Sequence, residues 1–207
     1  MEGPRVSVSG SPDHVRLRHA EVLAEWARLA TALREESLVA AVDAVGDVLV
    51  GCLAAGHGIL VAGNGGSAAM ASHVAAEFAG RCVRDRRPLP VMSLVDSTTA
   101  VTAVANDFGF DEVFARGVAA HGRPGDVLLV MTTSGRSANV LRALEVARDR
   151  GLVTVALTGG SGGARLAGLA DHVLVAPADN TPRIQEVHLA WTHAWSEAVD
   201  ETWAERE

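Results

Sequence analysis

Two segments rich in glycine and hydroxyl side chains have the composition of an anion-binding site. They are Gly63-Asn64-Gly65-Gly66-Ser67 and Thr132-Thr133-Ser134-Gly135-Arg136-Ser137, and a helical pattern follows each. Glycine lets the backbone approach an anion closely, and a helix N-terminus supplies free N–H groups. Tight turns or ordinary N-capping are the alternative explanations. Capping uses only one hydroxyl, however, and the second segment has four, so we favour a phosphate monoester as its ligand.

The first segment also fits the pattern G-x-G-x-x-A, a weak match to the dinucleotide fingerprint. Asp96, which follows the second apolar run, stands where a ribose-binding acid would lie. That interpretation leaves the hydroxyl-rich second segment without a role, so we disfavour a dinucleotide oxidoreductase. No lysine follows the glycines, which argues against a phosphate loop of the NTPase kind. A third glycine-rich segment, Thr158–Gly163, is better explained as turn structure.

His73 and Glu77 stand four residues apart in a helical pattern, which places them on one face about 6 Å apart along the axis. Such a pair can hold a metal or form a surface hydrogen bond, and alone it favours the hydrogen bond. In the last helical pattern, Gln185 and His193 differ by about 12 Å in rise and about 80° in rotation. His188 lies about 60° from Gln185 on the other side, so spacing does not choose between the two histidines.

Short apolar runs alternating with helical patterns indicate the elements that position these residues. The expected strands are Gly58–Gly63, Pro90–Val95, Asp126–Met131, Leu152–Leu157 and Asp171–Val175. The expected helices between and after them are Ser67–Gly80, Asp111–Ala120, Ser137–Arg150, Gly163–Leu169 and Arg183–Trp203. Nearly continuous apolar strands joined by helices predict a doubly wound, five-stranded parallel sheet of the Rossmann-like or flavodoxin-like α/β class. Two further helices, Val15–Leu33 and Leu38–Ala55, precede the sheet and could cap the domain or pair with another subunit.

Length and composition narrow the class of protein. The 207 residues fit a loose tail over 1–12 and one domain over 13–207. A net charge of −7 disfavours nucleic-acid binding. The basic run Arg81, Arg84, Arg86 and Arg87 is interrupted by Asp85 and is expected to be a solvated loop. The cysteines, Cys52 and Cys82, are expected to be buried thiols in a reducing compartment.

We expect no apolar run to reach the roughly 18–20 residues of a membrane span, and no signal pattern opens the chain. We therefore expect a soluble, cytoplasmic protein with no membrane partner.

Several motifs, taken in order, resemble the SIS (sugar isomerase) superfamily and, within it, the phosphoheptose isomerases. The resemblance spans about Val15 to Glu201. Its carriers are GNGGSA (63–68), SHVAAEFAGR (72–81), NDFGFDEVF (106–114), GDVLLVMTTSGRSANV (125–140), LTGGSGG (157–163) and RIQEVHLAWTH (183–193).

The resemblance implies an aldose–ketose isomerase that converts sedoheptulose 7-phosphate into D-glycero-D-manno-heptose 7-phosphate through an enediol. It implies one zinc ion per subunit, held by His73, Glu77, Gln185 and His193, and so favours His193 over His188. Glu77 would be the catalytic base and His193 its acid/base partner. It also implies a homotetramer with active sites at subunit interfaces. The implied substrate contacts are Asn64, Gly65, Gly66, Ser67, Glu77, Asn106, Asp107, Thr132, Thr133, Ser134, Ser137 and Gln185.

Three positions depart from the family pattern. Thr132 replaces a common serine, Arg136 a common asparagine, and Pro182 an aspartate that contacts the sugar in many members. The alternatives within the superfamily are a non-catalytic tetramer that binds a replication initiator and a sugar-phosphate-binding module without turnover. Glu77 and His193 disfavour the first, because that relative lacks an acid and an imidazole at the matching positions. The complete set of four implied ligands disfavours the second.

Overall fold

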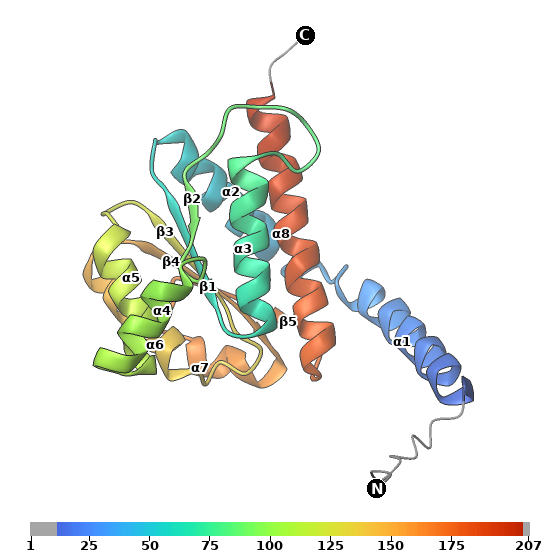
Figure 1. Ribbon diagram of the computed structural model, residues 1–207. Coiled ribbons are helices and arrows are strands. Elements are labelled where there is room, and N and C mark those ends of the chain that lie inside the picture. Colours follow the sequence, from blue (N-terminus) through green and yellow to red (C-terminus); the bar gives the residue numbers. More distant parts are fainter. Residues whose placement is uncertain (1–11, 205–207) are drawn as a thin grey trace, which may run out of the picture.

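The computed structural model describes residues 12–204, which form a five-stranded parallel sheet with helices on both faces (Figure 1). Its strands are β1 (Ile59–Gly63), β2 (Val91–Ser93), β3 (Val127–Met131), β4 (Val153–Gly159) and β5 (His172–Ala176). Their order, β2-β1-β3-β4-β5, is that of flavodoxin-like doubly wound sheets. The fold class expected from the sequence is therefore confirmed. The tail expected over 1–12 lies outside the described residues, except for Pro12, where the first helix begins.

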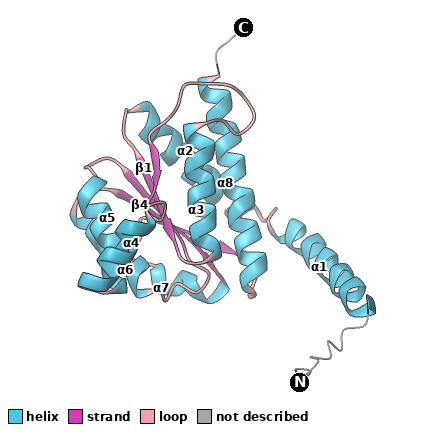
Figure 2. Cartoon of the chain, in the orientation of Figure 1, coloured by secondary structure: helices cyan, strands magenta, loops and turns pink. Residues whose placement is uncertain are grey.

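Eight α-helices accompany the sheet in the described part of the chain (Figure 2). They are α1 (Pro12–Ala32), α2 (Glu36–Ala54), α3 (Gly66–Ala79), α4 (Thr98–Phe108), α5 (Val113–His121), α6 (Ala138–Asp149), α7 (Gly163–Leu166) and α8 (Thr181–Trp203). Helices α2, α3 and α8 cover one face of the sheet, and α4, α5 and α6 cover the other (Figure 1). The sequence did not predict α4. None of its residues is fully buried, although Val101, Val104 and Ala105 stand at helical spacing and pack, half-buried, against the core under α5 and α6.

Each central strand contributes to two separate cores, because its side chains point alternately to the two faces of the sheet. In β3, Val127, Leu129 and Met131 pack with the core under α2, α3 and α8. Leu128 and Val130 pack with the core under α5 and α6. All five are almost wholly buried, which explains the continuous apolar run in the sequence.

Helix α2 corrects one expectation, since it is 19 residues long, contains a window with a mean hydropathy of 1.9, and passes the length and composition test for a membrane span. The test does not distinguish a span from a core helix. Val45, Leu49 and Leu53 of α2 are buried in the core beneath α3 and α8. Only 22% of the apolar window is buried in the single chain, however, so most of its surface is left uncovered.

The loop that follows α3 corrects a second expectation. Arg86 belongs to the basic run predicted to be solvated, yet its side chain is fully buried. The loop folds back over the end of α3, and the guanidinium pairs there with Asp200 of α8 at 3.0 Å. A buried charge of this kind is tolerated because it is paired and hydrogen-bonded. The neighbouring Arg81, Arg84 and Arg87 are exposed, as expected.

Candidate active site

The two predicted anion loops lie side by side at the carboxyl edge of the sheet. β1 ends at Gly63 and β3 ends at Met131, and these two residues are partners in the parallel register. The chain passes from β1 outward to β2 and then returns to the other side of β1 as β3. The loops therefore flank the topological switch point, where ligands of open α/β sheets bind.

Close packing explains the glycines of the first loop. A Cβ atom on Gly63 would lie 2.7 Å from Cβ of Ser67 and 2.9 Å from the backbone of that residue. Gly65 has a φ of +56°, in the left-handed region that favours glycine. A Cβ atom on Gly66 would lie 2.7 Å from Oε1 of Gln185, so the side chain of Gln185 rests directly on the loop.

In the second loop, the hydroxyl group of Ser137 does not cap the helix that follows. Thr132 Oγ1 accepts a hydrogen bond from the Gly135 N–H at 3.2 Å, which holds the turn. Ser137 is the N-cap residue of α6, but its side chain makes no capping hydrogen bond. The Ser137 hydroxyl and the first N–H groups of α6 thus remain available to an anion.

A cleft of about 280 Å³ joins the two loops to the start of α8. Its lining contains most of the predicted substrate contacts, together with two residues that the sequence analysis did not single out, Met131 and Thr181. The predicted contacts are Asn64, Gly65, Gly66, Ser67, Thr132, Thr133, Ser134, Ser137 and Gln185. The remaining predicted contacts, Glu77, Asn106 and Asp107, do not line this cleft, and Glu77 lies further along α3. Asn106 and Asp107 belong to α4. They lie exposed near the end of α4, where Asn106 Nδ2 donates to Asp107 Oδ1 at 2.7 Å.

Asn64 lines the cleft, but its side-chain amide is engaged elsewhere. Asn64 and Asn139 exchange two hydrogen bonds, each of 2.9 Å, through their side-chain amides. Asn139 lies in the first turn of α6 and is buried. This reciprocal pair ties the first loop to the helix that follows the second loop. Asn139 was not predicted as a site residue, although a polar residue in the first helical turn after a hydroxyl-rich loop could have indicated it.

Helices α3 and α8 bring three of the four predicted metal ligands together. The Nε2 atoms of His73 and His193 lie 2.9 Å apart. His73 Nε2 lies 3.5 Å from Oε1 of Glu77. Gln185, two helical turns before His193, contacts the first loop, where its Nε2 atom donates to Ser67 Oγ at 3.4 Å.

The chemistry of this donor set suits a divalent metal. Oε2 of Glu77 is buried and has no hydrogen-bond partner in the described residues. A buried carboxylate oxygen without a partner is costly, and a cation would satisfy it. Imidazole nitrogen and carboxylate oxygen are ligands that zinc accepts. Within residues 12–204, no three His, Cys, Asp or Glu side chains are arranged so that they could hold a metal ion as they stand.

Two nearby groups are unsuited to this role. His188 is buried, with its Nε2 atom 3.2 Å from the Thr158 carbonyl oxygen. Burial lowers the pKa of His188 to about 4, so the ring is neutral at pH 7. Burial, followed by the neighbouring Glu77 carboxylate, raises the pKa of Cys82 to about 12. The Cys82 thiol therefore stays protonated and is a poor metal ligand.

Arg136 and Pro182, two of the residues that depart from the family pattern, differ in their effect on the cleft. The Arg136 side chain does not line the cleft. Pro182 lies in the first turn of α8, where proline is well accommodated because that N–H has no helical partner. Asn180 caps the helix by accepting the Arg183 N–H at 3.0 Å. Pro182 therefore leaves the start of α8 intact while it removes a polar group beside the cleft.

Fold and cleft together define an open α/β domain with an anion-binding site at its switch point. The model of the SIS domain family matches residues 23–159. A phosphoheptose isomerase from Bradyrhizobium sp. is 47% identical over 164 residues, covering 79% of this chain and 82% of the relative. One from Mycobacterium tuberculosis is 46% identical over 168 residues, covering 81% and 85%. The chain therefore belongs to the phosphoheptose isomerase family of SIS-domain proteins.

A solved structure agrees with this assignment. The phosphoheptose isomerase from Neisseria gonorrhoeae superposes with a TM-score of 0.83 at 40% sequence identity. The superposition covers 90% of this chain and 99% of that structure.

Proposed function

We propose that this chain converts sedoheptulose 7-phosphate into D-glycero-D-manno-heptose 7-phosphate. The observation that carries the proposal is the arrangement of α3. This helix begins in the first anion loop at Gly66 and carries His73 seven residues later, about 10 Å along its axis. An open-chain sugar phosphate has its phosphate and its carbonyl at opposite ends, and this helix offers an anion site and a His/Glu pair at a matching separation.

In this proposal the phosphate occupies the cleft between the two loops. The free hydroxyl of Ser137 and the N–H groups at the starts of α3 and α6 would bind its oxygens. The Arg136 side chain lies outside the cleft, so binding would rest on backbone N–H groups and hydroxyls. Such a cradle orients the ligand without a fixed cation.

Proton transfer between the two adjacent carbons is assigned to Glu77 and His193. Glu77 would take the proton from one carbon and return it to the next, while His193 exchanges protons with the substrate oxygens. Both side chains lie on helices anchored in the core, so their separation is held by packing. The 2.9 Å distance between the Nε2 atoms of His73 and His193 supports this assignment, since a proton can pass between groups at hydrogen-bond distance.

We further propose that His73, Glu77, Gln185 and His193 hold one zinc ion. When bound, zinc would polarise the substrate oxygens as a Lewis acid. The buried, unpartnered Glu77 oxygen and the two converging imidazoles support this assignment.

The uncovered apolar surface of the first two helices supports a homotetramer as the working state. α1 stands away from the sheet (Figure 1), and its residues Val15 and Leu17 are 76% and 63% exposed. α2 adds the exposed Val39. Apolar residues gathered on two adjoining helices indicate a surface that other copies of the chain would cover. We propose that this assembly places the active sites at subunit interfaces, in a cytoplasmic protein with no nucleic-acid partner.

Turnover of sedoheptulose 7-phosphate, with and without added zinc, tests the function directly. We expect heptose 7-phosphate from the unaltered chain and loss of turnover in Glu77→Gln and His193→Ala. Glu145→Gln, at an exposed position of α6, is the matched control and should keep full activity. Binding of the sugar phosphate without turnover under any metal condition would contradict the proposal and favour a binding or scaffold protein.

A further inference from the structure

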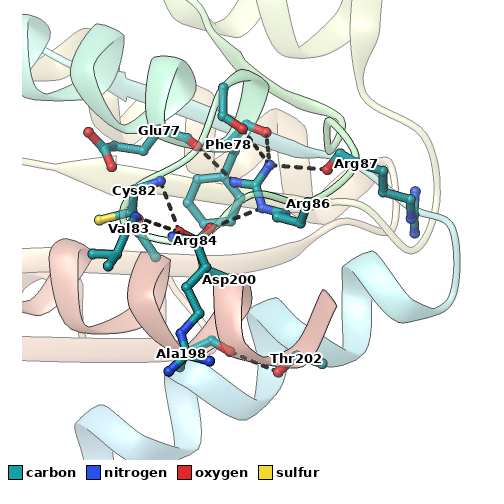
Figure 3. A network of polar contacts seen from close by, with 12 residues as sticks. Glu77, Phe78, Cys82, Val83, Arg84, Arg86, Arg87, Ala198, Asp200 and Thr202 are labelled. Carbon is teal, nitrogen blue, oxygen red and sulfur yellow. Dashed lines mark hydrogen bonds and ion pairs between the residues drawn. The ribbon is translucent and has the colours of Figure 1, made fainter. Parts of the chain in front are cut away.

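Arg86 and Asp200 form an ion pair that joins the two helices of the proposed catalytic site. Arg86 Nε donates to Asp200 Oδ1 at 3.0 Å, and both side chains are almost fully buried. Figure 3 shows the pair between the end of α3 and α8. A buried ion pair is weak evidence of net stabilisation, since removing two charges from water can cost as much as their attraction returns. Its other contacts indicate what it does.

The guanidinium of Arg86 closes the C-terminal end of α3. Its Nη2 atom donates to the Glu77 carbonyl oxygen at 2.8 Å, and its Nη1 atom donates to the carbonyl oxygens of Phe78 and Gly80 at 2.8 Å each. The last carbonyl groups of a helix have no partner within the helix, and a cation there also complements the helix dipole. Arg86 thus fixes the final turn, which carries Glu77.

Asp200 holds the loop that presents Arg86. Its Oδ2 atom accepts the backbone N–H groups of Cys82, Val83 and Arg84 at 3.0, 2.6 and 2.9 Å (Figure 3). Burial alone would raise the pKa of Asp200, but these N–H groups and the Arg86 charge lower it below the usual range. The carboxylate is therefore charged at neutral pH and satisfies both the loop and the guanidinium.

The position of Asp200 on α8 relates the pair to His193. Asp200 follows His193 by seven residues, which is about two turns, or roughly 10 Å, on nearly the same face. α3 and α8 are thus joined at two levels: through His73 and His193 at one, and through Arg86 and Asp200 at the other. Two separate attachments prevent one helix from rotating or sliding against the other.

We infer that Arg86 and Asp200 are a positioning pair, which sets the placement of Glu77 against His193 for proton transfer. The inference rests on the proposed function, because it takes Glu77 as the base. Both side chains are almost fully buried and engaged with each other, so the pair acts through the helix backbone and not through contact with substrate. Substrate binding at the other end of α3 should not depend on it.

The test uses the full-length protein with the variants Arg86→Lys and Asp200→Asn. Lysine keeps the charge but loses the planar fork that reaches three carbonyl groups of α3. Asparagine keeps the size of the Asp200 side chain, but it has only one acceptor oxygen. The carboxylate has two, of which one accepts the loop N–H groups and the other accepts from Arg86. Arg87→Lys makes the same chemical change one position along, at an exposed side chain.

We expect kcat to fall about 10- to 100-fold in both variants, because small misplacement of reacting groups has effects of that size. KM for sedoheptulose 7-phosphate should stay within about threefold, and the double variant should lose no more than the worse single one. Arg87→Lys should match the unaltered chain. Isothermal titration calorimetry should give the same number of sugar-phosphate sites per chain in every variant. The loss of kcat can then be attributed to sites that are folded and still bind the sugar phosphate.

Two results would overturn the inference while the proposed function stands. One is an unchanged kcat in Arg86→Lys and Asp200→Asn. The other is a number of binding sites that falls in parallel with kcat, because the pair would then serve folding only. Absence of turnover in the unaltered chain is a different result, since it contradicts the proposed function and removes the inference with it.

Discussion

The Nε2 atoms of His73 and His193 lie 2.9 Å apart, although 120 residues separate the two histidines. A hydrogen bond between two imidazoles needs one ring as donor and the other as acceptor, so the pair holds a proton between α3 and α8. Glu77 Oε1 lies 3.5 Å from His73 Nε2. These contacts bring two imidazoles and a carboxylate together where α3 and α8 meet.

We predict that His73→Ala lowers the zinc content of the purified protein while leaving it folded. His73 is partly exposed, so truncation creates no buried cavity, but it removes an imidazole that we propose as a zinc ligand. Atomic absorption measures the metal, and dialysis against a chelator followed by added zinc should abolish and then restore turnover. His121→Ala, an exposed histidine on α5, is the control. Equal zinc content in both variants would show that His73 is not a ligand.

The sheet could be predicted from the sequence because its strands are buried on both faces and appear as continuous apolar runs. The two anion loops were also predictable, since glycine and hydroxyl residues follow those runs directly. Helix α4 was missed, although Val101, Val104 and Ala105 stand at helical spacing, because this apolar stripe is short and none of its side chains is fully buried.

Contacts between distant segments could not be predicted, because they depend on how helices pack. Spacing within α8 left His188 and His193 equivalent, whereas packing buries His188 and turns His193 toward His73. Arg86 was expected in solvent because it belongs to a run of charged residues that Asp85 interrupts. Its burial depends on Asp200, which lies 114 residues further along the chain. The partner of Asn64 was missed for the same reason.

We predict that Gly66→Ala raises KM for the sugar phosphate. The added Cβ atom would lie 2.7 Å from Oε1 of Gln185, so the amide must move off the first loop. Gly51→Ala is the matched control, because a Cβ atom there meets nothing within 4 Å. Steady-state kinetics should show a KM increase of about tenfold, or 1.4 kcal/mol, in Gly66→Ala only. Unchanged kinetics in Gly66→Ala would show that Gln185 need not rest on the loop.

We predict that Asn139→Ala weakens both folding and substrate binding. The change removes two hydrogen bonds to Asn64 and leaves the amide of Asn64 without a partner in a partly buried place. The free energy of unfolding should fall by about 1–3 kcal/mol. KM should rise because the first loop loses its tie to α6. Chemical denaturation and kinetics measure the two effects. Stability and KM equal to those of the unaltered chain would show that the amide pair does not order the loop.

The buried ring of His188 makes stability depend on pH. Burial lowers the pKa of His188 to about 4, although the Thr158 carbonyl oxygen opposes the shift. In the unfolded chain the same ring titrates at its ordinary value near 6.5. Between these values the unfolded chain binds a proton that the folded chain does not. The folded state is therefore favoured fully above pH 6.5, and this contribution is lost as the pH falls toward 4.

We predict that His188→Asn flattens the pH dependence of stability between about pH 6.5 and pH 4. One proton per molecule limits the slope due to His188 to about 1.4 kcal/mol per pH unit, and the variant should lose that part of the slope. Urea denaturation at several pH values measures it. Asparagine keeps a polar group that can donate to the Thr158 carbonyl oxygen, which limits the loss of stability at pH 7. His121→Asn, at an exposed position, should leave the slope unchanged. Equal slopes in the unaltered chain and in His188→Asn would show that the ring is accessible to protons in the folded state.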